Sequence, residues 1–240
     1  MAADSPSTDD PRLDEDHVRT VAGGRIRLVG VVHDHPASRY RVHELVDRLQ
    51  PDVLALETPP LALPLFEQYA AGDGSIPAFG GELSAAIAAA EDARVVGIDG
   101  IDGRFVRTLS ANLRAERASL STIRSLADGV TSVLQHATIC RFAASVASLT
   151  GLRLEVDEPV DHECSLRDPP TVQAEDERSQ FTQSLSFLRV ADPPAPVRLR
   201  DETREECMAE RLRTLPDGDS VVAVVGRGHL DPLAELLDGA

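Results

Sequence analysis

Short apolar runs alternate with segments that have the spacing of amphipathic helices along most of the chain. Residues 26–32 are mostly apolar and β-branched, and similar runs follow at 53–57, 94–98 and 221–225. Such runs are typical of strands that are buried on both faces. Because helical patterns separate them, we predict right-handed crossovers between parallel strands. The chain should form an α/β fold with a mainly parallel central sheet flanked by helices.

The helices are predicted from apolar spacing and from residues that favour helix ends. Ser38 is a candidate N-cap for the first helix, which Pro51 should break. Asp231 followed by Pro232 is a favourable start for the last helix. The other helices are expected by the same criteria at residues 61–69, 82–92, within 104–149, and after Asp201.

Two segments have a different composition. Residues 1–18 are acidic and polar, which is typical of a disordered tail, so the single folded domain should span residues 19–240. Residues 155–200 carry many acids and six prolines. We therefore expect a helical and irregular insertion between the third and last strands, in which residues 155–200 have little regular structure apart from a short helix near 181–188.

The charge of the chain excludes some classes of partner. It has 24 basic and 40 acidic residues, a formal net charge of −16, and every basic residue is Arg. This composition resembles that of proteins from a very salty cytoplasm, such as that of a halophilic archaeon. No basic patch suited to a nucleic acid is present in the sequence. The sequence shows neither a signal peptide nor an apolar run long enough for stable membrane insertion, so we expect a cytoplasmic protein.

Each predicted strand ends at an ionisable residue. His33, Glu57, Asp99 and His229 follow the four apolar runs, or lie within a few residues of them. In a parallel sheet these ends share one edge, where ligands commonly bind. Two imidazoles with carboxylates are suitable ligands for a divalent metal, which can polarise a carbonyl and activate water. The alternative is that these are polar strand ends hydrogen-bonded to neighbouring loops.

Other polar residues near these ends have simpler interpretations. His35 precedes Pro36, which should stop the strand, so His35 is expected in a supporting or exposed position. Residues 226–228 predict a tight turn, with an anion-binding loop as the alternative. Residues 162–164 resemble metal ligands but fall in the acidic segment, where a surface position is expected.

Two G-x-x-H motifs, at residues 30–33 and 226–229, resemble the paired motifs of the TraB/PrgY family, within the wider TIKI, erythromycin-esterase and ChaN-like group. Four further segments resemble motifs of that family in the same order, and they lie at residues 51–57 (PD-x-V-x-V-E), 81–86 (GEM-x-x-A), 96–99 (V-x-L-I-D) and 200–208 (ERD-x-x-M). The matches extend over about residues 26–237. The family usually has Arg where this chain has Gly100, and Arg104 comes four residues later.

The convergence of strand ends and the resemblance together lead us to expect roles for nine residues. The metal ligands would be His33, Glu57 and His229, and the catalytic residues would be Glu82, Asp99 and Arg204. Glu82 or Asp99 would supply a fourth ligand or the base, and Arg204 would stabilise an anionic intermediate or a carboxylate. The substrate-binding residues would be Arg104, Arg227 and His35.

The resemblance also implies alternative functions. Animal TIKI relatives are metal-dependent proteases and PrgY-type members limit a peptide pheromone, which favours hydrolysis of a peptide or similar small-molecule acyl bond with Mn²⁺, Co²⁺ or Zn²⁺. ChaN-like relatives hold haem iron, so a non-catalytic peptide-, metal- or haem-binding regulator is the alternative. A third possible function is that of an interaction module whose site has lost its activity. The 6 Phe and 2 Tyr disfavour a stacked haem. Assembly as a homodimer stays open.

Overall fold

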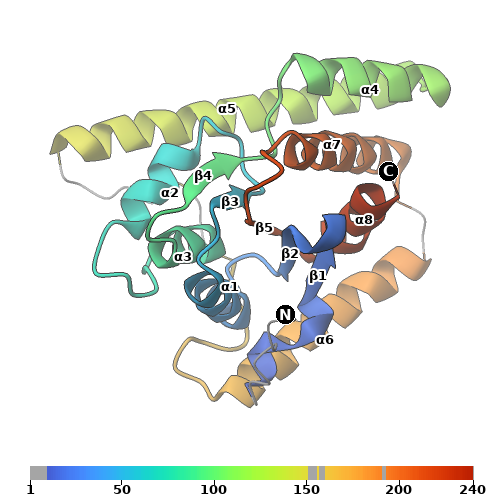
Figure 1. Cartoon of the computed structure of the whole chain (residues 1–240). Coiled ribbons are helices and arrows are strands. Elements are labelled where there is room, and N and C mark those ends of the chain that lie inside the picture. The colour runs from blue at the N-terminus through green and yellow to red at the C-terminus, as the bar shows by residue number, and fades with distance from the viewer. Residues whose placement is uncertain (1–9, 151–155, 157–159, 191–192, 240) are drawn as a thin grey trace.

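The computed structural model describes residues 10–150, 156, 160–190 and 193–239, and it has a five-stranded mixed sheet at its centre (Figure 1). The strand order is β1-β2-β5-β3-β4. The strands span Val18–Val21 (β1), Ile26–Val31 (β2), Val53–Leu56 (β3), Arg94–Gly97 (β4) and Val221–Gly226 (β5).

The sheet is mostly parallel, as predicted. β5 lies between β2 and β3 and is parallel to both, and β3 is also parallel to β4. In this register Leu56 is opposite both Val224 and Gly97, so β3, β4 and β5 end close together. The α/β fold with a mainly parallel central sheet flanked by helices is thereby confirmed.

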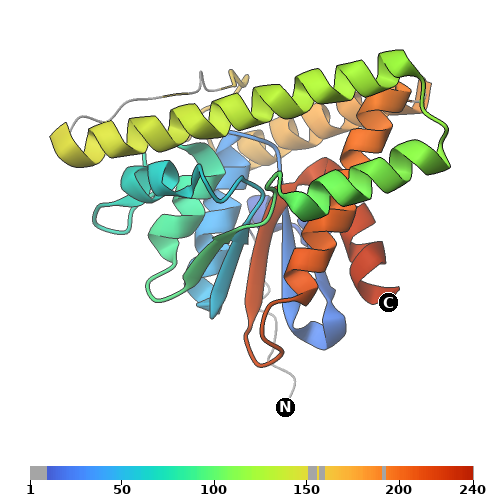
Figure 2. The same cartoon turned by 90° about the horizontal axis from the view of Figure 1, so that it is seen from above.

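Eight α-helices surround the sheet in the described residues. They span Pro36–Leu49 (α1), Leu63–Ala70 (α2), Gly81–Ala89 (α3), Gly103–Ala115 (α4), Leu120–Thr150 (α5), Pro170–Val190 (α6), Ala195–Arg213 (α7) and Arg227–Asp238 (α8). Figure 1 shows α1 and α3 on one side of the sheet and α7 and α8 on the other. Figure 2 shows α5 running across one end of the sheet. No helix in the described part of the chain combines the length and apolarity needed to cross a membrane.

The central strands β2, β3 and β5 are buried on both faces of the sheet, which explains their continuous apolar runs. On one face the strands pack against Met208 and Leu212 of α7 and Leu230 of α8. On the other face they pack against Val42 and Val46 of α1, together with residues of α3. A strand covered on both sides has no solvent-facing positions, so alternation of polar and apolar residues is lost.

The N-terminal segment corrects one prediction. Residues 10–18, expected to be part of a disordered tail, form two 3₁₀ turns, Pro11–Leu13 and Glu15–His17, and the first residue of β1. β1 pairs antiparallel with β2, because residues 22–25 form a tight connection that includes Gly23 and Gly24 at positive φ. Residues 1–9 lie outside the described residues.

The segment 155–200 corrects a second prediction, because most of its described part is helical. α6 begins at Pro170, and α7 begins at Ala195 with Pro196 in its first turn. Proline is favoured in a first turn because the N–H that it lacks has no partner there. Pro170 and Pro196 therefore mark helix starts. Residues 155, 157–159, 191 and 192 lie outside the described residues.

Two helix starts also differ from the prediction. The N-cap of α1 is His35, whose Nδ1 accepts the Ala37 N–H, whereas the Ser38 hydroxyl accepts the Val32 N–H. α8 begins at Arg227, directly after β5, with Pro232 inside the helix. The prediction of a tight turn at residues 226–228 is therefore wrong, because the strand passes into the helix without a loop.

Candidate functional site

The predicted convergence of strand ends around Gly226 is confirmed. A Cβ placed on Gly226 would lie 3.5 Å from Glu57 Oε2, 3.6 Å from His33 Nε2 and 3.7 Å from His229 Cδ2. The His33 and His229 rings therefore lie within the ~10 Å expected for a shared site. Any side chain at position 226 would enter this space, so glycine keeps the centre of the cluster open.

Arg204 of α7 joins the acidic residues at this edge. Its Nη2 donates to Glu57 Oε1 at 2.5 Å and to Asp99 Oδ2 at 2.8 Å, and its Nη1 donates to His229 Nε2 at 3.2 Å. Burial opposes the charge of Arg204, but the hydrogen bond and charge of Asp99, with the charge of Glu57, outweigh it and raise the pKa of the guanidinium. Arg204 thus remains a cation at the centre of the cluster.

His229 is oriented by a carboxylate on α7. Its Nδ1–H donates to Glu205 Oε1 at 2.8 Å, and its Nε2 accepts the bond from Arg204, which assigns the proton to Nδ1. Burial lowers the pKa of His229, but the Glu205 hydrogen bond and the charge of Glu57 give a net rise. Sequence reasoning missed the role of Glu205. Its position beside Arg204 in the segment 200–208 was the available signal.

His33 is oriented in the same way by Glu82 of α3. Its Nδ1–H donates to Glu82 Oε1 at 2.8 Å, and Glu82 Oε2 accepts the Asp34 N–H at 2.9 Å. The hydrogen bond with Glu82 raises the pKa of His33 to about 9. Glu82 is 3% exposed, and the His33 hydrogen bond and charge lower its pKa although burial opposes this. Asp34 has a φ of 59°, a left-handed backbone that is uncommon outside glycine.

The donor chemistry at this edge fits a metal, but Arg204 contacts part of it. Metal-binding histidines usually donate Nδ1–H to a carboxylate and bind the metal through Nε2. His33 and His229 both have the carboxylate at Nδ1. However, the ligand atoms of His33, Glu57 and His229 are not all within 4.8 Å of one another, as judged over the described residues. A metal bound by all three would require Arg204 to leave Glu57 and His229, while its three contacts with Asp99 could remain.

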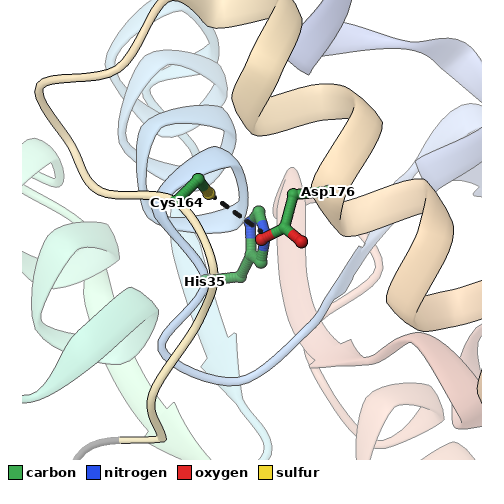
Figure 3. A group of neighbouring side chains, drawn as sticks. All are labelled: His35, Cys164 and Asp176. Atoms are coloured by element: carbon green, nitrogen blue, oxygen red, sulfur yellow. Dashed lines mark hydrogen bonds and ion pairs between the residues drawn. The ribbon is translucent and has the colours of Figure 1, made fainter.

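A second group of side chains, His35, Cys164 and Asp176, could hold a metal ion (Figure 3). Its ligand atoms lie within 4.8 Å of one another, and His35 and Cys164 are buried. His35 Nε2 lies 3.1 Å from Asp176 Oδ2 and 3.7 Å from Cys164 Sγ. Sequence reasoning missed this group, because a surface position was expected for residues 162–164, which is wrong for Cys164. The exposed position considered for His35 is excluded as well.

The protons in this second group are already assigned by its hydrogen bonds. Because His35 Nδ1 accepts the Ala37 N–H, the ring proton is on Nε2 and is donated to Asp176. Burial, with the hydrogen bond to Asp176, raises the pKa of Cys164 to about 12. A protonated thiol is a poor nucleophile, so the group does not resemble an activated cysteine site.

Two further predicted substrate contacts form ion pairs with acidic residues outside the strand-end cluster, which comprises His33, Glu57, Asp99, Arg204 and His229. Arg104 of α4 forms an ion pair with Glu210 at 3.6 Å. Arg227 forms an ion pair with Asp231 at 3.3 Å, and its guanidinium lies 4.4 Å from the centre of the Phe181 ring. Each arginine therefore has an acidic partner, and a substrate role for either stays a prediction.

A cleft of about 840 Å³ opens beside His33. Its lining includes His33, Asp34 and Arg39 from the β2–α1 region, Phe66 and Tyr69 from α2, and Glu82 from α3. On the opposite side of the cluster, Asp99 and Arg204 line a separate cavity of about 110 Å³ with apolar residues of α5. The larger cleft is therefore the approach to the oriented imidazole of His33.

No protein-family model, curated protein or solved structure matches this chain. The functional interpretation therefore depends on the residues described above and on their geometry.

Proposed function

We propose that this chain is a hydrolase of the TraB/PrgY type that acts on a peptide or similar acyl bond at the strand-end cluster. The observation that supports this most directly is the pair of imidazoles around Gly226, each held at Nδ1 by a carboxylate from a neighbouring helix. Groups fixed in this way are suited to hold a metal or to transfer a proton without reorientation. The cleft beside His33 would admit the substrate.

In this proposal His33, Glu57 and His229 would hold a divalent metal such as Mn²⁺, Co²⁺ or Zn²⁺. When bound, such a metal supplies a Lewis acid and lowers the pKa of coordinated water. Glu82 and Glu205 orient the two imidazoles. Arg204 would leave Glu57 and keep Asp99 in place through its remaining contacts with that carboxylate.

The test is metal analysis and peptide hydrolysis in high salt for the wild type, His229→Ala and His43→Ala. His43 is a matched control, because its Nε2 contacts only the Gly74 carbonyl oxygen in the described residues. We expect the wild type and His43→Ala to bind metal and hydrolyse peptides, and His229→Ala to lose both properties. Equal metal content in all three proteins would reject the ligand assignment.

The contact of Arg204 with Glu57 and His229 favours a second candidate, a binding protein without turnover. In that case the cluster is a neutralised structural network and the cleft holds a peptide, a metal complex or a haem without reaction. Metal or peptide binding by the wild type without hydrolysis of any member of a peptide library would favour this candidate.

A further inference from the structure

Arg39, one of the two arginines that line the cleft beside His33, has no acidic partner in the described part of the chain. Arg39 of α1 lines the cleft, and its Nη2 donates to the Pro77 carbonyl oxygen. Its Nε is buried without a hydrogen-bond partner. Asp34 and Glu82 affect it only through longer-range charge, and burial lowers the pKa of its guanidinium. Within the described residues, no carboxylate forms an ion pair with Arg39.

Other arginines with an unpartnered buried nitrogen do not share this property. Arg104, Arg213 and Arg227 each have one such nitrogen. Each of them nevertheless forms an ion pair with a carboxylate, from Glu210 in the first two cases and from Asp231 in the third. Arg39 differs because no carboxylate of the described residues lies within ion-pair distance of its guanidinium.

A partly buried cation without a counter-ion is costly. Removing a guanidinium from water and leaving its N–H groups unpaired costs free energy that a nearby anion would recover. In a chain with 40 acidic residues, an acidic partner would be easy to supply from the protein itself. The uncompensated charge of Arg39 in the cleft therefore indicates a ligand that carries its own anionic group.

The aromatic residues of the cleft indicate what accompanies that group. Phe66 and Tyr69 of α2 also line the cleft, and their rings meet edge to face with centroids 6.3 Å apart. Such a surface suits an apolar or aromatic side chain. Arg39 adds a planar fork that pairs with a carboxylate through two hydrogen bonds.

We propose that Arg39 binds the carboxylate of the substrate, as found at the C-terminus of a short peptide, and that the adjoining side chain packs on Phe66 and Tyr69. This inference rests on the proposed function, since it names the substrate class of the same cleft. An elongated ligand anchored at Arg39 would extend toward His33, which lines the same cleft.

The test measures binding of N-acetylphenylalanine and of its uncharged amide by calorimetry. These probes differ in the carboxylate alone and need no turnover. We expect the wild type to bind the acid at least about tenfold more tightly than the amide, and Arg39→Gln to bind both equally. Arg48→Gln is the matched control, because Arg48 lies on the same helix and pairs with Glu44 on the surface. It should keep the preference.

A second variant protects the test against misfolding. Arg39→Lys keeps the charge and loses the fork, so it should retain part of the preference for the acid. Equal binding of acid and amide by the wild type, or no binding of the acid, would overturn the proposal. Displacement of the acid by an equal concentration of inorganic phosphate would also overturn it, because the site would then be a general anion site.

The proposal and the proposed function can fail separately. If the wild type prefers the acid but hydrolyses no peptide, the carboxylate site stands and hydrolysis is rejected. If peptides are hydrolysed with equal efficiency whether they end in a carboxylate or an amide, hydrolysis stands and the role of Arg39 is rejected.

Discussion

At the scale of single residues, the His33–Glu82 pair makes the stability of the fold depend on pH. The pKa of His33 is raised from 6.5 to about 9 by its hydrogen bond with Glu82, so the protonated imidazole favours the folded state. This stabilisation is fully present below pH 6.5 and is lost as pH rises through 9. We expect the denaturant midpoint of the wild type to fall across that range.

The control for this prediction is Glu82→Gln, which removes the carboxylate and should flatten the dependence between pH 6.5 and 9. The imidazole resonances of His33 can be followed by NMR at the same time. Titration of His33 near pH 6.5 in the wild type would contradict the prediction.

Arg204 belongs to the same scale, because one guanidinium holds several charges in place. Arg204→Gln leaves Glu57 and Asp99 without their cation, which we expect to cost about 3 kcal/mol of unfolding free energy. The variant should regain part of this loss on addition of Mn²⁺, since a competing cation has been removed. Thermal melts with and without Mn²⁺ measure both effects. An unchanged melting temperature in Arg204→Gln would show that the cluster contributes little to stability.

The apolar pattern alone indicated site residues only near the ends of strands, whereas Glu82 and Arg204, which lie on helices, were indicated by the resemblance. His33 and Glu57 come directly after apolar runs, and the parallel sheet brings such ends together. Glu205 and Arg39 lie on helices, where a charged residue has no distinguishing pattern. Their roles depend on which neighbour the tertiary fold places opposite them, and this information is not local in the sequence.

At the scale of elements, α6 is fixed to α1 by a buried ion pair. Glu177 contacts Arg41 and the Ser38 hydroxyl, and Arg41 is fully buried. Glu177→Ala would leave a buried guanidinium without its partner, at an expected cost of about 3–5 kcal/mol. Glu175→Ala, on the exposed side of the same helix, is the matched control and should change stability by less than ~0.5 kcal/mol. Urea denaturation measures both, and equal midpoints would contradict the prediction.

The elements that were mispredicted have a common physical cause. α6 carries a mostly polar sequence with prolines around it, yet its buried positions include Gln173 and Glu177, which are stabilised by specific partners. β1 has only four residues and becomes a strand because β2 offers it an edge. Apolar periodicity detects neither case, whereas it located β2, β3 and β5, which are buried on both faces, and also β4 at the edge of the sheet.

At the scale of the whole molecule, the charge predicts a response to salt. The net charge of −16 produces repulsion that dissolved ions screen. We expect the melting temperature to rise as KCl is increased from about 0.1 M to about 2 M, where the Debye length falls from ~10 Å to below ~3 Å. The buried Arg41–Glu177 pair should be screened little by these ions. A melting temperature that falls steadily with KCl would contradict this interpretation.

The position of β5 has a consequence for how the protein is made. β5 occupies the middle of the sheet but is the last of its strands in the chain. During synthesis, β2 and β3 therefore emerge long before the strand that joins them, and each has one edge without its native partner. Closure of the sheet must wait until β5 emerges, and α8 comes directly after it. The imidazole of His229 arrives with α8, so a chain synthesised only as far as α7 carries His33 and Glu57 but lacks the second imidazole of the site.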